Sequence, residues 1–304
     1  MIKIAFMGSA QFSIASFEEL LNCKEIEIKA VLTTPAKPKG RGMKLQNNVV
    51  HDFALKNGFS EEQIFAIHSF KESDVSQRLV EMDLDFIVVV AFGKIIPEGV
   101  IRIPKIKILN LHPSVLPKYR GAAPIERAIE NGEKEIEICI MEVVKALDAG
   151  DVYASVFYDV EGKYASEIVP EVARRGAVLM RDVLLGMNEN FSSYKPRRQN
   201  EEDATYAHKI EKNELLLDFS QNVEVILNKV RAFDLYGGCY FVHNRVRVKV
   251  FEVQIRIEKH SKEIGFFDVE RGEVYCNGGV VVLKQIQLEN QKRCEFWSAI
   301  GFLK

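Results

Sequence analysis

Two side chains that could cooperate in group transfer lie at the end of one apolar run. Asn110 and His112 close the run over residues 106–112 and are two residues apart. In a β-strand, residues with this spacing project from the same face. A carboxamide that donates to a developing oxyanion and an imidazole that accepts a proton form a workable pair for acyl transfer. The structural alternative is an amide that caps a strand end beside a buried histidine whose hydrogen bonds are satisfied.

The residues after this pair predict a rigid, extended segment. Pro113 and Pro117 restrict the backbone and exclude a helix. Arg120-Gly121 then indicates a turn, and Pro124 stands where the first turn of a new helix is expected. Asn110 and His112 would therefore sit at the carboxyl end of a central strand, which is where open α/β sheets bind their ligands.

A carboxylate that could complete the set is Asp148, in the sequence Leu-Asp-Ala-Gly-Asp over residues 147–151. The segment falls between two apolar runs, so Asp148 is expected on a loop before a strand. There it could orient His112 or a water molecule and stabilise an imidazolium. By itself the sequence is equally typical of an ordinary turn, because Asp and Gly are turn formers.

Two groups of cations could meet a polyanion. Lys37, Lys39, Arg41 and Lys44 share one loop with two prolines and two glycines, a composition suited to contacts with backbone phosphates. Further along, the run Arg245-Val-Arg247-Val-Lys249-Val is predicted as a strand with three cations on one face and three valines on the other. That outer stripe could follow a nucleic-acid backbone. Each group could instead be ordinary solvated surface.

The first turn after a strand argues against a dinucleotide cofactor. It reads Gly8-Ser-Ala-Gln-Phe12 and contains only the first of the three glycines that such a turn requires. The chain also lacks a His-Glu-x-x-His or Cys-x-x-Cys pattern. No nicotinamide cofactor and no metal are therefore expected.

The elements around these residues predict a doubly wound α/β domain with a mainly parallel sheet. Apolar runs rich in Ile and Val alternate with amphipathic stretches over residues 1–160, as in strands buried on both faces. The runs are 2–7, 26–32, 85–91, 106–112 and 136–143, and the helical stretches lie near 11–22, 48–58, 71–82, 124–131 and 165–187. We assign residues 1–190 to this domain.

Residues 191–205 are polar and rich in turn formers, and we interpret them as a linker. The pattern of predicted elements then changes over residues 206–304. One helix is expected near 221–232, followed by strands at 239–242, 245–257, 265–269 and 279–288. Short strands separated by turns predict a small β-barrel, with the OB fold as one candidate.

Composition fits a globular protein without membrane segments. Of the 304 residues, 47% are apolar and 28% are charged, which allows sizeable cores and excludes disorder and collagen for the whole chain. No apolar run approaches the roughly 20 residues of a membrane helix, and the N-terminus reads as a strand instead of a signal peptide. Five scattered cysteines predict a reducing, cytoplasmic setting without disulfides. The net charge of −2 does not indicate which kind of partner the protein binds.

Taken together, these motifs resemble the methionyl-tRNA formyltransferase family, within the enzymes that use 10-formyltetrahydrofolate. The resemblance spans nearly the whole chain. It rests on the Thr-Thr-Pro…Gly-Arg-Gly loop, on residues 88–97, on 110–125, on Leu-Asp-Ala-Gly-Asp, on 205–212 and on 230–234. The 110–125 motif together with Leu-Asp-Ala-Gly-Asp is specific to formyl-folate enzymes. The basic loop and the C-terminal half favour a tRNA acceptor.

The resemblance implies transfer of a formyl group from 10-formyltetrahydrofolate to the amine of methionine on initiator tRNA. We further expect a monomer that has no membrane partner. The resemblance implies catalytic roles for Asn110, His112 and Asp148. It also implies folate-binding roles for Ser114, Val115, Leu116 and Pro117, and for Phe92, Gly93, Ile95 and Ile96 in a loop around the pterin. tRNA contacts are implied for Lys39, Arg41 and Lys44, and, on an OB-type C-terminal domain, are expected for Arg245, Arg247 and Lys249.

The chain departs from the family pattern in its C-terminal half, where residues 234–238 replace an aromatic-proline pair and residues 263–276 match weakly. These departures concern single tRNA contacts more than the chemistry. Three alternatives remain open: an N-formyltransferase acting on nucleotide sugars, a formyl-folate hydrolase, and a tRNA-binding module without activity.

Overall fold

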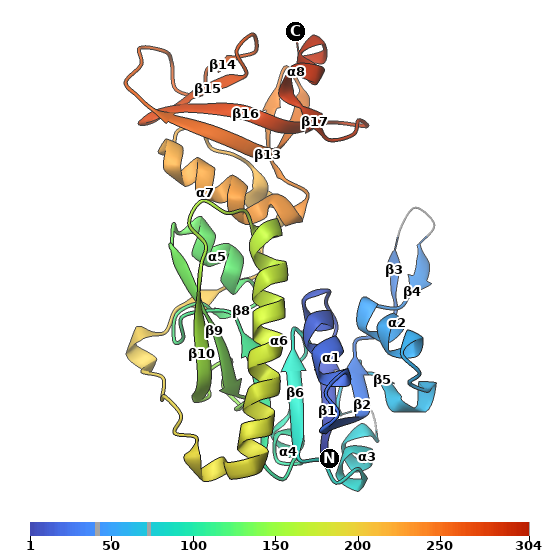
Figure 1. The fold of residues 1–304 in the computed structure, drawn as a ribbon. Coiled ribbons are helices and arrows are strands. Elements are labelled where there is room, and N and C mark those ends of the chain that lie inside the picture. The colour runs from blue at the N-terminus through green and yellow to red at the C-terminus, as the bar shows by residue number, and fades with distance from the viewer. Residues whose placement is uncertain (40–42, 72–73, 304) are drawn as a thin grey trace. The chain divides into compact units, whose positions relative to one another are not determined.

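The computed structural model describes residues 1–39, 43–71 and 74–303, and Figure 1 shows its fold. The chain forms two compact units. Unit 1 contains Met1–Ala122, Glu137–Tyr158 and Val169–Tyr206, and unit 2 contains Ala123–Ile136, Asp159–Ile168 and Ala207–Lys304. Segment 191–205, interpreted above as a linker, belongs to unit 1. The domain boundaries at 190 and 206 stay a prediction.

Unit 1 is built on a seven-stranded sheet in the order β10-β9-β7-β6-β1-β2-β5. The pairs β1–β2, β1–β6, β2–β5 and β6–β7 are parallel, and β9 runs antiparallel to β7. The strands are β1 (Ile2–Gly8), β2 (Ile26–Thr33), β5 (Ile64–Ala66), β6 (Phe86–Val90), β7 (Lys107–His112), β9 (Glu135–Glu142) and β10 (Val152–Asp159). Every residue of β6 is buried, as expected for a strand covered on both faces. The predicted mainly parallel sheet is confirmed.

Helices and small strands complete the chain up to residue 207. The helices are α1 (Phe12–Leu21), α2 (Val49–Lys56), α3 (Val75–Glu81), α4 (Glu98–Ile101), α5 (Pro124–Glu130) and α6 (Ala165–Asn190). The short strands are β3 (Lys37–Lys39), β4 (Lys44–Gln46), β8 (Arg120–Gly121) and β11 (Tyr206–Ala207). Single 3₁₀ turns in the chain are η1 (Glu61–Gln63), η2 (Phe191–Ser193), η3 (Glu201–Asp203), η4 (Lys212–Leu215), η5 (Asp234–Tyr236) and η6 (Ile300–Phe302). The predicted helices are present, with ends shifted by a few residues.

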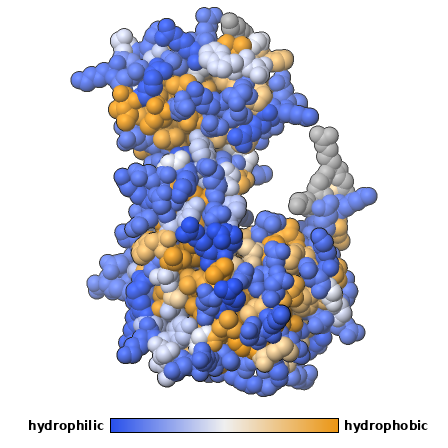
Figure 2. Space-filling view, in the orientation of Figure 1, coloured by the Kyte–Doolittle hydropathy of each residue, from blue (hydrophilic) through white to orange (hydrophobic). Residues whose placement is uncertain are grey.

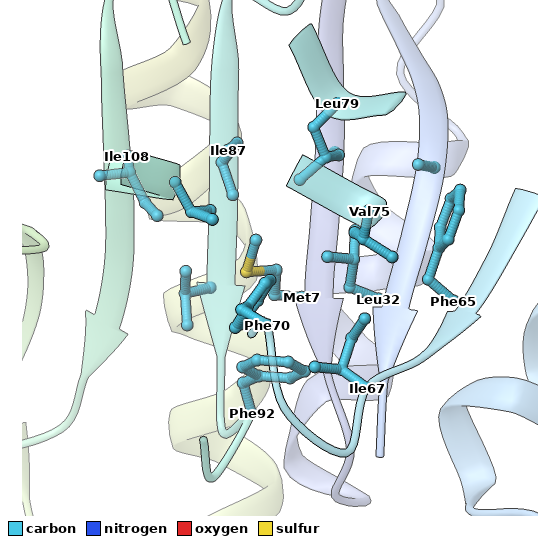
Figure 3. Packing of buried hydrophobic residues seen from close by; sticks show 14 of the residues in the cluster. Met7, Leu32, Phe65, Ile67, Phe70, Val75, Leu79, Ile87, Phe92 and Ile108 are labelled. Carbon is cyan, nitrogen blue, oxygen red and sulfur yellow. The ribbon is translucent and has the colours of Figure 1, made fainter. Parts of the chain in front are cut away.

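Helices cover both faces of the sheet. On one face, Phe17 of α1 stacks on Phe6 of β1 with ring centroids 4.8 Å apart. On the opposite face, Val75 and Leu79 of α3 pack in one cluster with Met7, the next residue of β1 (Figure 3). Because neighbouring residues of a strand point to opposite faces, α1 and α3 lie on different sides. This is the doubly wound arrangement that the alternation predicted.

Close packing of α6 fixes the orientation of β7. A Cβ atom added at Gly176 of α6 would lie 2.6 Å from Leu111 Cδ1 and 3.2 Å from Ile138 Cγ2. Leu111 of β7 therefore faces α6. Its neighbours Asn110 and His112 must face the other side, which is the side of the apolar cluster that contains Ile108 (Figure 3). The apolar face of β7 thus becomes polar toward its carboxyl end.

Unit 2 contains a curled antiparallel sheet that forms a half-barrel. Its strands follow the order β12-β13-β16-β15-β14, and β17 pairs with β16. They are β12 (Cys239–His243), β13 (Val246–Ile257), β14 (Phe267–Asp268), β15 (Glu273–Cys276), β16 (Gly279–Leu288) and β17 (Cys294–Glu295). Two helices accompany the sheet, α7 (Val223–Phe233) and α8 (Phe296–Ala299). The strands predicted from 239 to 288 are present, and β15 lies in the stretch that carried no clear strand signal.

Arg245 was wrongly predicted as part of a strand. Asn244 and Arg245 both have positive φ, 48° and 67°, and they join β12 to β13 as a two-residue turn, with His243 paired to Val246. A tight hairpin of this kind requires positive φ at both central residues. The strand begins at Val246, so two of the three predicted cations, Arg247 and Lys249, lie in this strand.

Figure 2 shows hydrophilic and hydrophobic side chains interspersed over the visible face of the molecule. Among the described residues, no helix combines the length and the apolar character that crossing a bilayer requires. Single exposed apolar side chains are normal on a protein surface.

The contact between α6 and β7 can be tested with Gly176→Val. The added side chain collides with Leu111 and Ile138, so we expect the free energy of unfolding to fall by about 1–3 kcal/mol. Chemical denaturation measures the change. Gly99→Val in α4 is the control, because nothing lies within 4 Å of a Cβ atom at that position. Equal stability of the two variants would contradict the close packing.

Candidate active site

The candidate site begins at the carboxyl end of β7. Asn110 lies between Val89 of the parallel neighbour β6 and Met141 of the antiparallel neighbour β9. His112 pairs with Cys139 of β9. Both residues share the face opposite Leu111, as the strand period requires. The structure thus brings the predicted pair together on one face of a central strand.

Asn110 is half-buried. Within the described part of the chain, its side-chain amide takes part in no hydrogen bond of the protein. A polar group in such a position ordinarily finds a partner. The amide is therefore free to donate to an oxygen of a bound molecule.

His112 is buried, with 4% of its surface exposed. Its Nε2 lies 3.1 Å from the carbonyl oxygen of Tyr119. Because a carbonyl only accepts, Nε2 carries the proton in this contact. In the neutral ring the other nitrogen, Nδ1, is then unprotonated, and it lies 3.6 Å from Asp148 Oδ2. The basic nitrogen of His112 therefore faces a carboxylate.

Asp148 is held in an unusual backbone conformation on the loop between β9 and β10. Its φ is +46°, a region that costs a non-glycine residue free energy. Its Oδ2 accepts the backbone N–H of Gly121 at 2.9 Å. Two residues later, a Cβ atom at Gly150 would lie 1.9 Å from the carbonyl oxygen of Glu142. The glycine of this loop is therefore required by a close approach of backbone to backbone.

The segment predicted to contact folate follows directly. Ser114 is buried and its hydroxyl donates to the carbonyl of Lys118 at 2.8 Å. Leu116 is buried in a cluster with Cys139 and Met141. Val115 and Pro117 are only half-buried. In this structure, Val115 and Pro117 present side-chain surface, whereas Ser114 and Leu116 hold the segment in place from inside.

The loop over residues 92–96 follows β6, and it also combines a buried residue with residues that expose surface. Phe92 is buried, and its ring packs against Phe70 with centroids 6.2 Å apart (Figure 3). Gly93 is exposed with φ +72°, Ile95 is 92% exposed and Ile96 is half-buried. Ile95 therefore presents apolar surface to solvent on the loop that follows β6.

The basic loop in the N-terminal half forms a hairpin. β3 and β4 pair antiparallel, with Lys39 opposite Lys44, and the Lys44 side chain is exposed. Arg41 lies outside the described residues. At the base of the hairpin, the Asn48 side chain accepts the backbone N–H groups of Val50 and His51 and so caps α2.

The cations of unit 2 form a smaller group than predicted. The Arg247 guanidinium lies 4.3 Å from the ring centroid of Tyr240 and its side chain is exposed, while Lys249 is half-buried. Arg245 is exposed in the turn. Val248 and Val250 are buried beneath them. The expected alternation of outward cations and inward valines therefore holds from residue 246 onward.

Sequence reasoning missed the residues that hold the candidate catalytic groups in place. The Tyr119 carbonyl contacts His112, the Gly121 N–H contacts Asp148, and Gln199 donates to two carbonyls of the Asp148 loop. Contacts made by backbone N–H and carbonyl groups cannot be predicted from the pattern of side chains. Gln199 belongs to the polar stretch that composition alone indicated as a linker. Within the part of the chain that the structure describes, no group of three or more His, Cys, Asp or Glu residues could hold a metal ion.

Comparisons with known proteins identify the families to which the two halves of the chain are similar. Residues 2–180 match the formyl transferase family and residues 209–301 match the formyl transferase C-terminal domain. The methionyl-tRNA formyltransferase of Sulfurihydrogenibium sp. (strain YO3AOP1) is 38% identical over 298 residues, which cover 96% of this chain and 94% of that protein.

Two solved structures share the fold. One is an N-formyltransferase from Helicobacter canadensis in complex with folinic acid and dTDP-3-aminofucose, with a TM-score of 0.64, 18% identity and coverage of 93% of this chain and 99% of that one. The other is the methionyl-tRNA formyltransferase from Clostridium thermocellum, with a TM-score of 0.54, 14% identity and coverage of 95% and 99%. By its matches over nearly the whole length, the chain belongs to the methionyl-tRNA formyltransferase family.

Proposed function

We propose that this protein transfers a formyl group from 10-formyltetrahydrofolate to the α-amine of methionine on initiator tRNA. The observation that carries the proposal is the set of a free carboxamide, an imidazole and a carboxylate at one strand end, in a chain of this family. The protein would act as a monomer in the cytoplasm, with no metal and no NAD.

His112 is the proposed base. The amine must lose a proton as its nitrogen bonds to the formyl carbon. With Nε2–H directed at the Tyr119 carbonyl, the nitrogen that takes this proton, directly or through a water, is Nδ1. The imidazolium that results has Asp148 Oδ2 3.6 Å away. The carboxylate offsets a charge that would otherwise be buried alone.

Asn110 is the proposed oxyanion donor. When the amine attacks, the formyl oxygen becomes negative, and an amide N–H that has no other partner can donate to it. Loss of one such donor typically costs about 3 kcal/mol of barrier, roughly a hundredfold in rate. The bond between the formyl carbon and N10 of the folate then breaks, and N10 leaves with the proton that His112 returns. No covalent intermediate with the protein is required.

The remaining predicted residues are proposed to bind the two substrates. The exposed or half-buried members of the predicted folate-binding set would offer surface to the pterin, namely Val115, Pro117, Gly93, Ile95 and Ile96. Phe92, Ser114 and Leu116, which are buried, would shape the loops from behind. Lys39, Arg41 and Lys44 on the basic loop, and Arg245, Arg247 and Lys249 in unit 2, are proposed to meet tRNA phosphates.

The catalytic assignment is tested by formylation of Met-tRNA with Asn110→Ala, His112→Ala and Asp148→Ala. Each variant should lose about a hundredfold or more in kcat, since each removes a group that acts mainly on the transition state. Circular dichroism and thermal unfolding must show a folded protein. Near-normal turnover of all three folded variants would overturn the assignment.

The choice of acceptor is tested in the same assay. Wild-type protein should formylate Met-tRNA and should not formylate an amino-sugar nucleotide. It should also release little tetrahydrofolate when no acceptor is added. Preference for the sugar would identify the nucleotide-sugar reaction, and rapid release without an acceptor would identify a hydrolase.

The basic loop is tested by salt and by substitution. Formylation at low Met-tRNA concentration should fall steeply with added salt, because binding to phosphates releases counterions. Arg41→Ala should raise the KM for Met-tRNA about tenfold and leave the KM for the folate unchanged. Lys56→Ala is the matched control, since it removes an exposed cation of α2 on the same unit. A reaction insensitive to salt, or equal effects of the two variants, would contradict the proposal.

A further inference from the structure

Segment 197–205 is bonded along its length to the loops that carry the catalytic groups. The backbone of Arg197 pairs with that of Val152, and its guanidinium donates to the carbonyl of Leu116 at 2.9 Å. At the other end, Thr205 accepts the backbone N–H of Tyr119 through its hydroxyl and that of Arg120 through its carbonyl, both at 2.9 Å. This stretch, which contains the single 3₁₀ turn η3, is therefore fixed at both ends.

Gln199 lies between these anchors and makes four hydrogen bonds. Its Nε2 donates to the carbonyl of Asp148 at 2.9 Å and to that of Gly150 at 2.7 Å. Its Oε1 accepts Nε and Nη2 of Arg120 at 3.0 and 2.8 Å. Both donor hydrogens and both acceptor sites of the amide are thus used.

Arg120, which donates to Oε1 of Gln199, is itself held in place. Arg120 is 1% exposed, and its Nη1 and Nη2 donate to the two carboxylate oxygens of Glu201 at 2.9 and 2.8 Å. These bonds hold the pKa of Glu201 below its usual range. A buried guanidinium with a bidentate carboxylate is a rigid support, so Gln199 cannot turn without breaking bonds to it.

The loop that Gln199 holds needs support. Asp148 has positive φ, and such a conformation persists only where the surroundings enforce it. Its carboxylate must lie close to Nδ1 of His112 for the proposed chemistry. A shift of about 1 Å at a reacting group can lower a rate about a hundredfold.

We infer that Gln199 is a positioning residue, which holds the Asp148 carboxylate beside His112 by donating to the carbonyls of Asp148 and Gly150. This inference rests on the proposed function. It assigns a role in the reaction to segment 197–205, in which the sequence analysis found no functional motif. The competing reading is that Gln199 serves only as a partner of buried Arg120.

Gln199→Glu separates the two readings. The substituted side chain still accepts from Arg120, and its charge favours that contact. At neutral pH it cannot donate to Asp148 and Gly150, and it places a carboxylate against their carbonyls. If Gln199 only serves Arg120, the variant should work as well as the wild type. If Gln199 positions Asp148, kcat should fall about 10- to 100-fold with the KM for each substrate changed less than threefold.

A double-mutant cycle shows whether the effect passes through Asp148. In an Asp148→Asn background, Gln199→Glu should cause little further loss, because groups that act through each other are not additive. Gln77→Glu provides the matched control with the same charge change at an exposed position of α3. Glu201→Gln removes the charge of the carboxylate to which Arg120 donates. This substitution should change kcat far less than Gln199→Glu.

Amide hydrogen exchange gives a readout independent of activity. The Gly121 N–H, which donates to Asp148, and the amides of residues 146–151 should exchange faster in Gln199→Glu than in wild type. A variant with wild-type kcat and wild-type exchange would overturn the inference. If exchange rises but the wild type does not formylate Met-tRNA, the proposed function fails while the structural coupling stands.

Discussion

The site depends on one steric constraint, the contact of β7 with α6. Gly176 lets the helix backbone approach so closely that Leu111 must point toward it. Since a strand alternates strictly, Asn110 and His112 are turned together to the opposite face. A register error of one residue would reverse this and bury the amide and the imidazole under α6. A packing contact on the opposite face of the sheet thus decides which side the proposed catalytic pair faces.

The groups that complete the site come from loops in strained conformations. Ala91, Tyr119 and Asp148 all have positive φ without being glycine. Ala91 directly precedes Phe92, the carbonyl of Tyr119 contacts His112, and Asp148 is itself a predicted catalytic residue. Such residues store strain that the surrounding structure must offset. Here the offset comes from hydrogen bonds across long sequence separations, such as that of Gly121 with Asp148 and those of Gln199.

Much of the fold and the core of the site could be predicted from local patterns. The run over 106–112 is apolar and rich in Ile and Leu, so its strand, and the shared face of Asn110 and His112, followed from period two. Gln199 could not be found in this way, because its bonds to a loop some fifty positions earlier leave no periodicity. Arg245 was misassigned because a pattern of alternating cations and valines continues into a turn, where only backbone geometry marks the end of the strand.

In the described part of the chain, the hydrogen bonds to Asp148 and its loop come from amides, and the arrangement of charge gives a reason for this. In the proposed mechanism, buried His112 gains a proton, and among the described residues the carboxylate that lies near enough to offset this charge is that of Asp148. A cation bonded to Asp148 would compete with the imidazolium and weaken that stabilisation. The nearest guanidinium of this network, on Arg120, is directed to Glu201 instead, and the neutral amide of Gln199 separates it from the Asp148 loop. Arg120 therefore supplies rigidity to the candidate site and does not compete with His112 for the Asp148 carboxylate.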